Sequence, residues 1–226
     1  MNIKIYNRIQ ELLKAAPNIM TNPQHLKVVI QAEFEIVMNG HPSSIESLVQ
    51  TVDEMVLEKY FGKVWQPKTK KYKYSGLDII DEINALKPNN VLDLGCGYNE
   101  FKGKIHNITG VDPYNDKADI KSGILDYHPE TKYDVTICLG SINFGSTDKI
   151  IGELAHAVTL TSPEGLLFFR ANPGKQHEAP EAKWIDFFEW TPEFILNTAE
   201  ALNCIVVTIR ADANRLFFIL KRRNEK

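Results

Sequence analysis

Residues 91–99 read Val91-Leu92-Asp93-Leu94-Gly95-Cys96-Gly97-Tyr98-Asn99, and this stretch decides the fold. Four residues typical of a buried strand come first, and a turn with two glycines follows at once. Glycine permits backbone angles that other residues avoid, and it has no Cβ to obstruct a ligand lying against the turn. Ligands of open α/β sheets bind at the carboxyl ends of the strands. The stretch therefore predicts a strand that delivers Asp93 to a ligand site.

A second acid ends the next predicted strand, in Thr109-Gly110-Val111-Asp112-Pro113. Asp112 follows Asp93 by 112 − 93 = 19 residues. An acid that projects from the second strand of such a sheet can accept hydrogen bonds from both hydroxyls of a ribose. The glycine turn and this acid together indicate a ligand that contains a nucleoside.

The turn disfavours a nicotinamide dinucleotide. Such a cofactor needs a Gly-x-Gly-x-x-Gly turn whose helix start binds a pyrophosphate. Here Glu100 stands where the third glycine belongs, and Asp93 would add negative charge near the phosphates. The same acid suits a ligand that carries an ammonium and a sulfonium group, as S-adenosylmethionine does.

Strands and helices alternate along the chain from residue 76 onward. Helices are predicted from the cap residues Ser75 and Asp78 to Leu86, over 147–160, and from the cap residue Thr191 to about Leu202. Strands are predicted at 91–94, 108–111, 118–120, 133–139, 165–171, 204–209 and 216–220. This alternation predicts a doubly wound, mostly parallel seven-stranded α/β sheet, and the last two strands form an antiparallel hairpin.

Residues 1–75 show no strand pattern and predict an N-terminal helical extension or cap, followed by the ligand-binding domain over 76–226. Apolar residues recur at helical spacing over 26–38 and 45–60. Residues 63–74 differ, because lysines alternate there with Trp65, Tyr72 and Tyr74. We interpret this stretch as a solvated linker, and the alternative is a cationic aromatic arm.

Composition narrows the class of protein. The chain has 226 residues, 43% hydrophobic and 24% charged, and a formal net charge of −3, which gives no global attraction to nucleic acid or anionic lipid. No run reaches the roughly 18 apolar residues that cross a bilayer, and the first residues lack a secretory signal. Cys96, Cys138 and Cys204 form no metal-ligand cluster and suit a reducing compartment. We expect a cytoplasmic protein without a metal.

Residues 91–139 resemble class I S-adenosylmethionine-dependent methyltransferases. The stretch 91–97 resembles the first motif of that family, 110–112 its ribose-binding acid, 119–126 its adenine segment and 133–139 its fourth strand. With the terminal hairpin, the likeness covers about residues 76–221 and implies a Rossmann-like fold and S-adenosyl-L-methionine as cofactor.

The resemblance also implies a set of cofactor-binding residues. The first-motif residues would hold the methionine end, Asp112 the ribose, and the backbone amide of Ile124 with Asp126 would lie near adenine. Leu139 and Gly140 would line the methionine side opposite Gly95. The full set is Asp93, Gly95, Cys96, Gly97, Asp112, Gly123, Ile124, Asp126, Leu139 and Gly140.

The chain departs from the family pattern at three places. Asn99 replaces the third glycine of the first motif, and asparagine tolerates left-handed backbone angles. Gly123 stands where the family often has an acid that contacts the adenine amino group, and Asp126 is the candidate substitute. Only about ten residues separate Gly97 from the second strand, so we expect an unusually short helix between them.

Methyl transfer needs no obligatory catalytic signature, because the sulfonium is itself a good methyl donor and the protein must mainly align the reactants. The candidate catalytic residues are Asn143 after the fourth strand and Asn172 and His177 after the fifth. His177 has the ordinary pKa for a general base, although a lone loop histidine is also a common surface residue. The asparagines can orient an acceptor, or they can satisfy turn amides.

The sequence therefore predicts an S-adenosylmethionine-dependent methyltransferase with a small-molecule acceptor. The Asn/Asp-Pro-Pro-aromatic motif of enzymes that methylate amino groups of nucleobases is missing from 140–145. Two alternatives are an aminopropyl-type transferase, which needs acids that 140–145 lacks, and a non-enzymatic cofactor-binding or scaffolding module. Nucleic acid could bind only through Lys63–Lys73, and we do not favour it.

Overall fold

The computed structural model describes residues 1–224 except 41, 66–75, 175–176 and 178. The chain forms two compact units, one of Met1–Gln66 with His177–Asp186 and one of Pro67–Gln176 with Phe187–Lys226. The domain boundary predicted after residue 75 places residues 177–186 in the second domain. In the structure, contacts group this segment with the N-terminal helices. The lysine-rich stretch interpreted as a linker falls largely outside the described residues.

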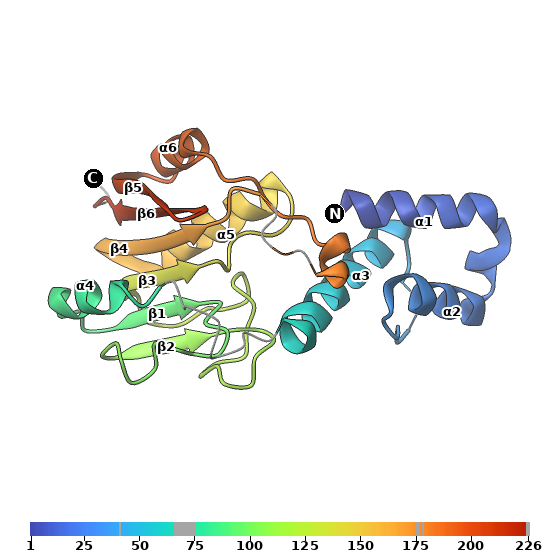
Figure 1. The fold of residues 1–226 in the computed structure, drawn as a ribbon, viewed down its shortest axis with the longest axis horizontal. Coiled ribbons are helices and arrows are strands. Elements are labelled where there is room, and N and C mark those ends of the chain that lie inside the picture. Colours follow the sequence, from blue (N-terminus) through green and yellow to red (C-terminus); the bar gives the residue numbers. More distant parts are fainter. Residues whose placement is uncertain (41, 66–75, 175–176, 178, 225–226) are drawn as a thin grey trace. The chain divides into compact units, whose positions relative to one another are not determined.

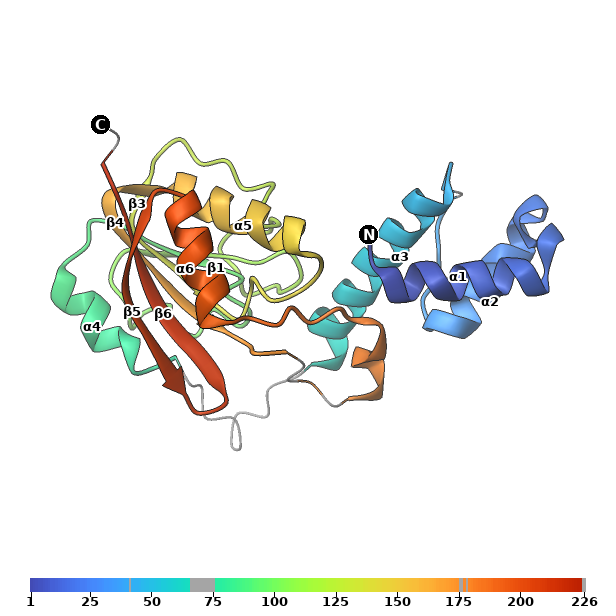
Figure 2. The same ribbon diagram turned by 90° about the horizontal axis from the view of Figure 1, so that it is seen from above.

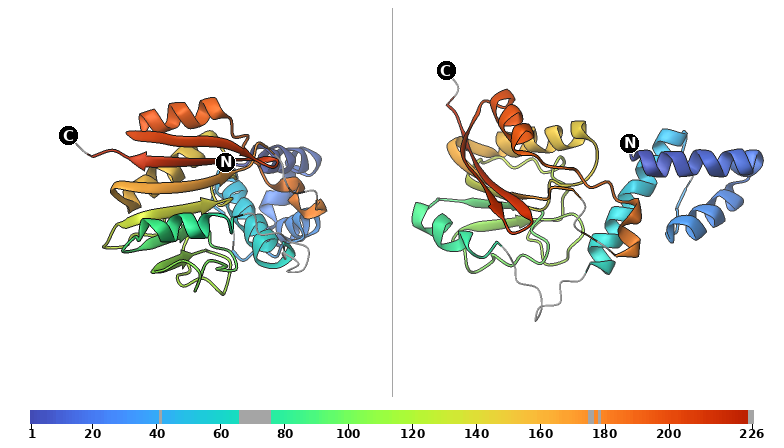
Figure 3. Two further views of the ribbon diagram at one scale, coloured as in Figure 1. Left: turned by 60° about the vertical axis from the view of Figure 1, so that its left-hand side comes forward. Right: turned by 45° about the horizontal axis from the view of Figure 1, so that its top comes forward.

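A six-stranded sheet forms the centre of the second unit, in the order β2-β1-β3-β4-β6-β5 (Figure 1; Figure 3, left). Strand β1 pairs in parallel with β2 and β3, β3 pairs in parallel with β4, and β6 is antiparallel to β4 and β5. The predicted mostly parallel sheet with a terminal hairpin is thereby confirmed. The strands are β1 (Val91–Leu94), β2 (Ile108–Val111), β3 (Tyr133–Leu139), β4 (Thr161–Ala171), β5 (Cys204–Asp212) and β6 (Arg215–Arg222).

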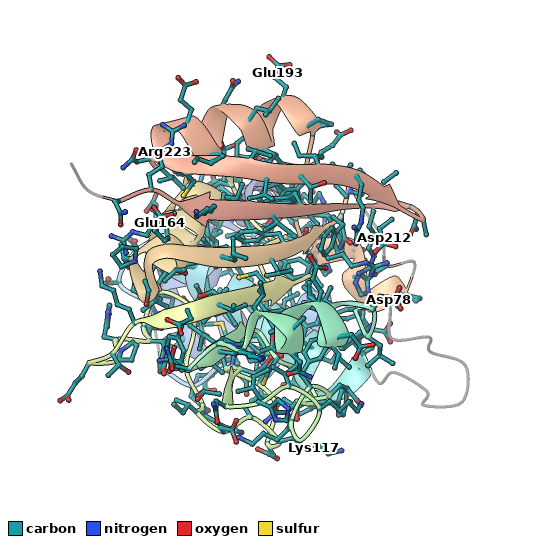
Figure 4. The ribbon with its side chains drawn as sticks, turned by 90° about the vertical axis from the view of Figure 1, so that its left-hand side faces the viewer. Asp78, Lys117, Glu164, Glu193, Asp212 and Arg223 are labelled. Carbon is teal, nitrogen blue, oxygen red and sulfur yellow. The ribbon has the colours of Figure 1, made fainter. Side chains whose placement is uncertain are left out.

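Helices cover both faces of this sheet. Helices α5 (Thr147–Leu160) and α6 (Pro192–Ala201) lie on one face, and α4 (Ile79–Leu86) lies on the other (Figure 2). Side chains of a strand alternate between the faces, so Phe169 packs in the cluster under α5 and α6 while Phe168 packs under α4. Figure 4 shows Asp78 and Asp212 at one end of the sheet and Glu164 and Arg223 at the other.

The predicted seventh strand at 118–120 is wrong, because only Ile120 bridges to Val111 on the free edge of β2. The Asp119 side chain explains the loss of pairing. Its Oδ2 accepts the backbone N–H of Gly110 at 2.8 Å, which a neighbouring strand would otherwise bind. The backbone N–H groups of Asp119 and Ile120 both donate to Gly110 O, at 2.9 and 3.1 Å, and the N–H of Asp112 donates to Ile120 O at 3.1 Å, so the pairing with β2 is limited to the single bridge at Ile120.

The predicted short helix between β1 and β2 is also wrong, because residues 95–107 form successive turns. Asn99, Gly103 and Asn107 have φ angles of 56°, 77° and 54°, which a right-handed helix excludes. Phe101 and Ile105 nevertheless bury their side chains against β1, β2 and α4. The turns therefore replace the helix as the cover of this part of the sheet.

The first unit is helical and consists of α1 (Ile3–Ala15), α2 (Pro23–Phe34), α3 (Ile45–Lys59), the 3₁₀ helices Pro17–Thr21 and Pro180–Trp184, and the π-helical turn Tyr60–Val64. Asn2 ties three segments together, because its Nδ2 donates to Asp53 Oδ1 at 2.9 Å and to Trp184 O at 2.8 Å. Across the described part of the chain, none of the helices has the length and apolar character required to cross a membrane.

Candidate functional site

Asp93 is the last residue but one of β1, and only 2% of its surface is exposed. Its Oδ2 has no hydrogen-bond partner among the described residues. Burial, together with the negative charge of Asp112, raises the pKa of Asp93 from 3.8 to about 8. A buried acceptor without a donor is costly, and a buried carboxylate without a cation is more so. The end of β1 is therefore built for a cationic, hydrogen-bonding partner.

The glycine turn after β1 combines a tight contact with an open space. Gly95 has a φ of 73°, and a Cβ there would lie 2.2 Å from Ser141 Cβ, which requires a glycine. Gly97 has a φ of 52°, but a Cβ added there would meet no atom of the described structure within 4 Å. The turn thus packs on the loop after β3 at Gly95 and leaves the space beside Gly97 for a ligand.

Asp112 directly follows β2, and its carboxylate accepts more hydrogen bonds from the protein itself than the sequence suggests. Its Oδ1 accepts the backbone N–H groups of Tyr114 and Asn115, both at 2.8 Å, and its Oδ2 accepts the N–H of Gly97 at 3.0 Å. A carboxylate has about four lone-pair sites. The remaining site is on Oδ2, so we expect Asp112 to bind one ribose hydroxyl instead of two.

Asn99 and Asp119 fix the turn that carries these residues, and sequence reasoning assigned Asp119 no such role. Asn99 Nδ2 donates to Lys117 O at 3.0 Å and to Asp119 Oδ2 at 3.3 Å, while Lys102 forms an ion pair with Asp119 at 2.8 Å. Burial alone would raise the pKa of Asp119, but the hydrogen bonds from Gly110, Lys102 and Asn99 lower it below its ordinary value. The left-handed angle expected for Asn99 is confirmed at 56°.

The predicted adenine segment forms a turn in which the backbone N–H of Asp126 donates to Gly123 O at 3.3 Å. A Cβ added at Gly123 would lie 2.8 Å from Asp126 Oδ2. The Asp126 carboxylate therefore fills the volume that a side chain at position 123 would take. Ile124 is partly buried against the core cluster under α5 and α6.

Asn143 and Asn172 meet at the carboxyl ends of β3 and β4. Asn143 Oδ1 accepts the backbone N–H of Asn172 at 2.9 Å, and the two side chains are 1% and 2% exposed. Asn143 Nδ2 and Asn172 Oδ1 lack a hydrogen-bond partner within the described residues, as does the hydroxyl of Ser141. The structure thus brings together two of the three predicted catalytic residues and leaves them with unused polar groups.

The remaining predicted cofactor residues line the same end of the sheet. Cys96 is buried, and burial, followed by the charges of Asp93, Asp112 and Asp119, raises the pKa of its thiol far above the ordinary value, so the thiol stays protonated. Leu139 ends β3, and Gly140 follows with a φ of 95°. A Cβ at Gly140 would lie 3.8 Å from Asn143 Nδ2 and 3.9 Å from Arg215 Nη1.

His177 belongs to the helical unit. Its Nδ1 lies 3.0 Å from the hydroxyl of Tyr60, and its ring contacts Tyr60, Phe61 and Trp65 edge to face, with centroid distances of 5.5, 6.0 and 6.2 Å. His177 is therefore an oriented, aromatic-packed residue and differs in this respect from a free surface histidine. Its role as a base stays a prediction.

The hydrogen-bonding groups that still lack a partner among the described residues fit S-adenosylmethionine. Asp93 offers a buried acceptor for the cationic end, Gly97 leaves room beside the turn, and Asp112 retains an accepting site for a hydroxyl. Within the described ranges, no group of three or more His, Cys, Asp or Glu side chains could hold a metal ion.

No family model and no curated protein sequence matches the chain. Among solved structures, it is similar to the 1,6-didemethyltoxoflavin-N1-methyltransferase of Burkholderia thailandensis, with bound S-adenosylhomocysteine, at 14% identity and a TM-score of 0.59, covering 83% of this chain and 94% of that one. It is also similar to the magnesium protoporphyrin IX methyltransferase of Synechocystis PCC 6803 with bound S-adenosylhomocysteine, at 13% identity and a TM-score of 0.56, covering 75% and 99%.

A third similar structure is the [4+2]-cyclase SpnF, at 10% identity and a TM-score of 0.52, covering 66% of this chain and 80% of that one. The chain therefore has the fold of S-adenosylmethionine-dependent methyltransferases, as the sequence resemblance implies. Because one protein with this fold is a cyclase, the fold by itself does not decide the reaction.

Proposed function

We propose that this protein is an S-adenosylmethionine-dependent methyltransferase that acts on a small-molecule acceptor. One observation carries the proposal: Asp93 holds a buried carboxyl group whose Oδ2 has no partner in the described chain, at the end of β1 and beside a glycine turn that leaves space at Gly97. The two methyltransferases described above share this fold, and both hold S-adenosylhomocysteine.

The residues divide the recognition of the cofactor. Asp93 would hold the cationic amino-acid end, Asp112 Oδ2 would accept a ribose hydroxyl, and Asp126 would lie near adenine. The cofactor supplies an activated methyl group when it is bound. The chain's own contribution is to orient the acceptor and exclude water, and we propose Asn143 and Asn172 for the orienting role. The predicted base His177 belongs to the helical unit, where Tyr60 orients its ring, and its role in the reaction stays a prediction.

Small-molecule acceptors are favoured over the alternatives. Both similar methyltransferases are named for small substrates. An aminopropyl-type transferase would need acids after β3 to hold a polyamine, and residues 140–145 contain none. A purely structural module would gain nothing from a partnerless buried carboxyl at Asp93.

Two measurements test the proposal. Calorimetric titration should show binding of S-adenosylhomocysteine, and weaker binding of 5′-methylthioadenosine, which keeps the adenosine but lacks the ammonium group. Asp93→Asn should reduce the difference between these two ligands. A screen for radiolabelled methyl transfer over small acids, amides, phenols and amines should then identify the acceptor class. The proposed cofactor is wrong if neither nucleoside binds, and binding without transfer to any class would favour a scaffolding module.

A further inference from the structure

The amide of Asn143 has a fixed orientation and an unused donor. Its Oδ1 accepts the backbone N–H of Asn172 at 2.9 Å. Turning the amide over would place an NH₂ group against that N–H, so the oxygen must face Asn172. Nδ2 consequently lies on the side of the amide away from this N–H, and among the residues that the structure describes it finds no acceptor.

The unused donor lies close to Gly140, one of the predicted cofactor-binding residues. A Cβ at Gly140 would be 3.8 Å from Asn143 Nδ2, and Gly140 directly follows β3. Asn172 Oδ1, which lacks a hydrogen-bond partner over the described ranges, supplies an unused acceptor from the end of β4. The two asparagines, joined by the bond from the Asn172 N–H to Asn143 Oδ1, therefore carry one unused buried donor and one unused buried acceptor at the carboxyl ends of two neighbouring strands.

The surrounding contacts hold this pair rigidly. The backbone N–H of Phe188 donates to Asn143 O at 2.9 Å, and that of Trp190 donates to Asn172 O at 3.3 Å. The indole of Trp190, which is 2% exposed, donates to Ile142 O at 3.1 Å. Both asparagines are thus fixed by backbone bonds that leave Nδ2 and Oδ1 unused, as expected of a preorganised binding site.

We infer that Asn143 and Asn172 form a recognition site for an acceptor molecule that carries a carbonyl next to an N–H, such as a lactam or cyclic amide. Asn143 Nδ2 donates to the carbonyl oxygen, and Asn172 Oδ1 accepts the N–H. A neutral pair of amides suits a neutral polar group better than a carboxylate or an ammonium, whose burial would need an opposite charge. This inference rests on the proposed function, because it assigns the acceptor class of the same site.

The test uses the protein saturated with S-adenosylhomocysteine and small cyclic probes at millimolar concentration, observed through side-chain amide resonances. The lactam 2-piperidone should shift the amide resonances of Asn143 and Asn172. N-methyl-2-piperidone lacks the N–H, and it should bind about tenfold more weakly, as expected for one lost hydrogen bond. Cyclohexanone, which also lacks the N–H, should bind no better than the N-methyl lactam.

Two isosteric variants form a matched pair. Asn143→Asp keeps the oxygen that faces Asn172 but can donate only while its carboxyl is protonated, so its affinity for 2-piperidone should fall as the pH rises. Asn172→Asp keeps the accepting oxygen and should retain binding of the lactam. The wild type should show no dependence on pH, because amides do not titrate.

The outcomes separate this inference from the proposed function. Failure of S-adenosylhomocysteine to bind would contradict the proposed function itself. Normal binding of S-adenosylhomocysteine with equal affinity for both lactams, or no lactam-specific shift at either asparagine, would overturn the inference alone. A loss of S-adenosylhomocysteine affinity in Asn143→Asp would also overturn it, because the donor would then serve the cofactor.

Discussion

The backbone N–H of Gly97 donates to Asp112 Oδ2 at 3.0 Å, and this bond joins the turn after β1 to the end of β2. The bond places the open space beside Gly97 next to the accepting site that remains on Asp112. It also means that Asp112 holds the turn as well as any ligand, so its substitution affects both.

Asp112→Ala should weaken binding of S-adenosylhomocysteine by about 1–3 kcal/mol, the usual cost of leaving hydrogen-bonding groups unsatisfied. To separate the ribose contact from the turn, the wild type is titrated with 5′-methylthioadenosine and its 2′-deoxy and 3′-deoxy analogues. We expect the wild type to discriminate against only one deoxy analogue, because a single lone-pair site remains. Asp112→Ala should lose that discrimination, and equal discrimination in both proteins would remove Asp112 from the ribose site.

Cofactor affinity should rise with pH because of Asp93. The raised pKa of about 8 means that the free protein keeps this carboxyl protonated at neutral pH. A ligand ammonium favours the ionised form, so binding releases a proton. The association constant for S-adenosylhomocysteine should then increase up to about tenfold per pH unit from about pH 6 to pH 8 and level off above.

Asp93→Asn is the control for this pH dependence, measured by titration calorimetry in buffers of different ionisation enthalpy. The variant should bind more weakly and show no release of a proton over the same range. A wild-type affinity that falls with rising pH would mean that the ligand binds the protonated carboxyl.

The same substitution should change stability in the opposite direction. The folded Asp93 has a pKa raised from 3.8 to about 8, so the folded state holds a proton that the unfolded state has lost, and stability falls as pH rises through this window. Asp93→Asn removes this loss. Relative to the wild type, its free energy of unfolding should gain up to about 4 kcal/mol between about pH 5 and pH 8, at about 1.4 kcal/mol per unit. Urea denaturation at several pH values measures the gain, and parallel curves would contradict it.

The strands that build the site were predictable because apolar runs fixed their ends. The predicted bounds Val91–Leu94, Ile108–Val111 and Tyr133–Leu139 agree with the structure, and so does the helix Thr147–Leu160. The prediction failed where a side chain takes a backbone hydrogen bond that a strand would make, and where left-handed residues interrupt a helix. Asp119 takes the N–H of Gly110, and left-handed residues after Gly97 break the expected helix, although Phe101 and Ile105 have helical spacing.

The candidate site divides in the same way. The acids and glycines of the site could be identified from the sequence, because their residue types and spacing are unusual. The partnerless state of Asp93, Asn143 and Asn172 depends on what lies around each group in space, and no spacing rule reveals it. Likewise, the grouping of 177–186 with the N-terminal helices depends on contacts such as the bond from Asn2 to Trp184 O.

Asp126 should be exchangeable with an acid at position 123. Asp126→Ala should weaken cofactor binding, and adding Gly123→Asp to it should restore affinity, because the new carboxylate would enter the volume that Asp126 leaves. Gly123→Ala alone is the matched control. Its Cβ would meet Asp126 Oδ2 at 2.8 Å and displace it, so it should weaken binding although the acid is still present. Calorimetric titration decides, and unchanged affinity in Asp126→Ala would exclude this residue from the adenine site.

The two glycines of the turn should respond differently to alanine. In Gly97→Ala the new Cβ lies in open space, so the free energy of unfolding should fall only by the cost of holding alanine at a left-handed angle, about 1–2 kcal/mol. The same Cβ should obstruct the cofactor. Gly95→Ala adds a Cβ at 2.2 Å from Ser141 Cβ and should cost at least about twice as much. Ser141→Gly should recover most of that excess in the double variant but none of the cost of Gly97→Ala, because only Gly95 shares the contact. Denaturation curves for this double-mutant cycle measure the coupling, and additive effects of the substitutions at 95 and 141 would show that the turn relaxes without Ser141.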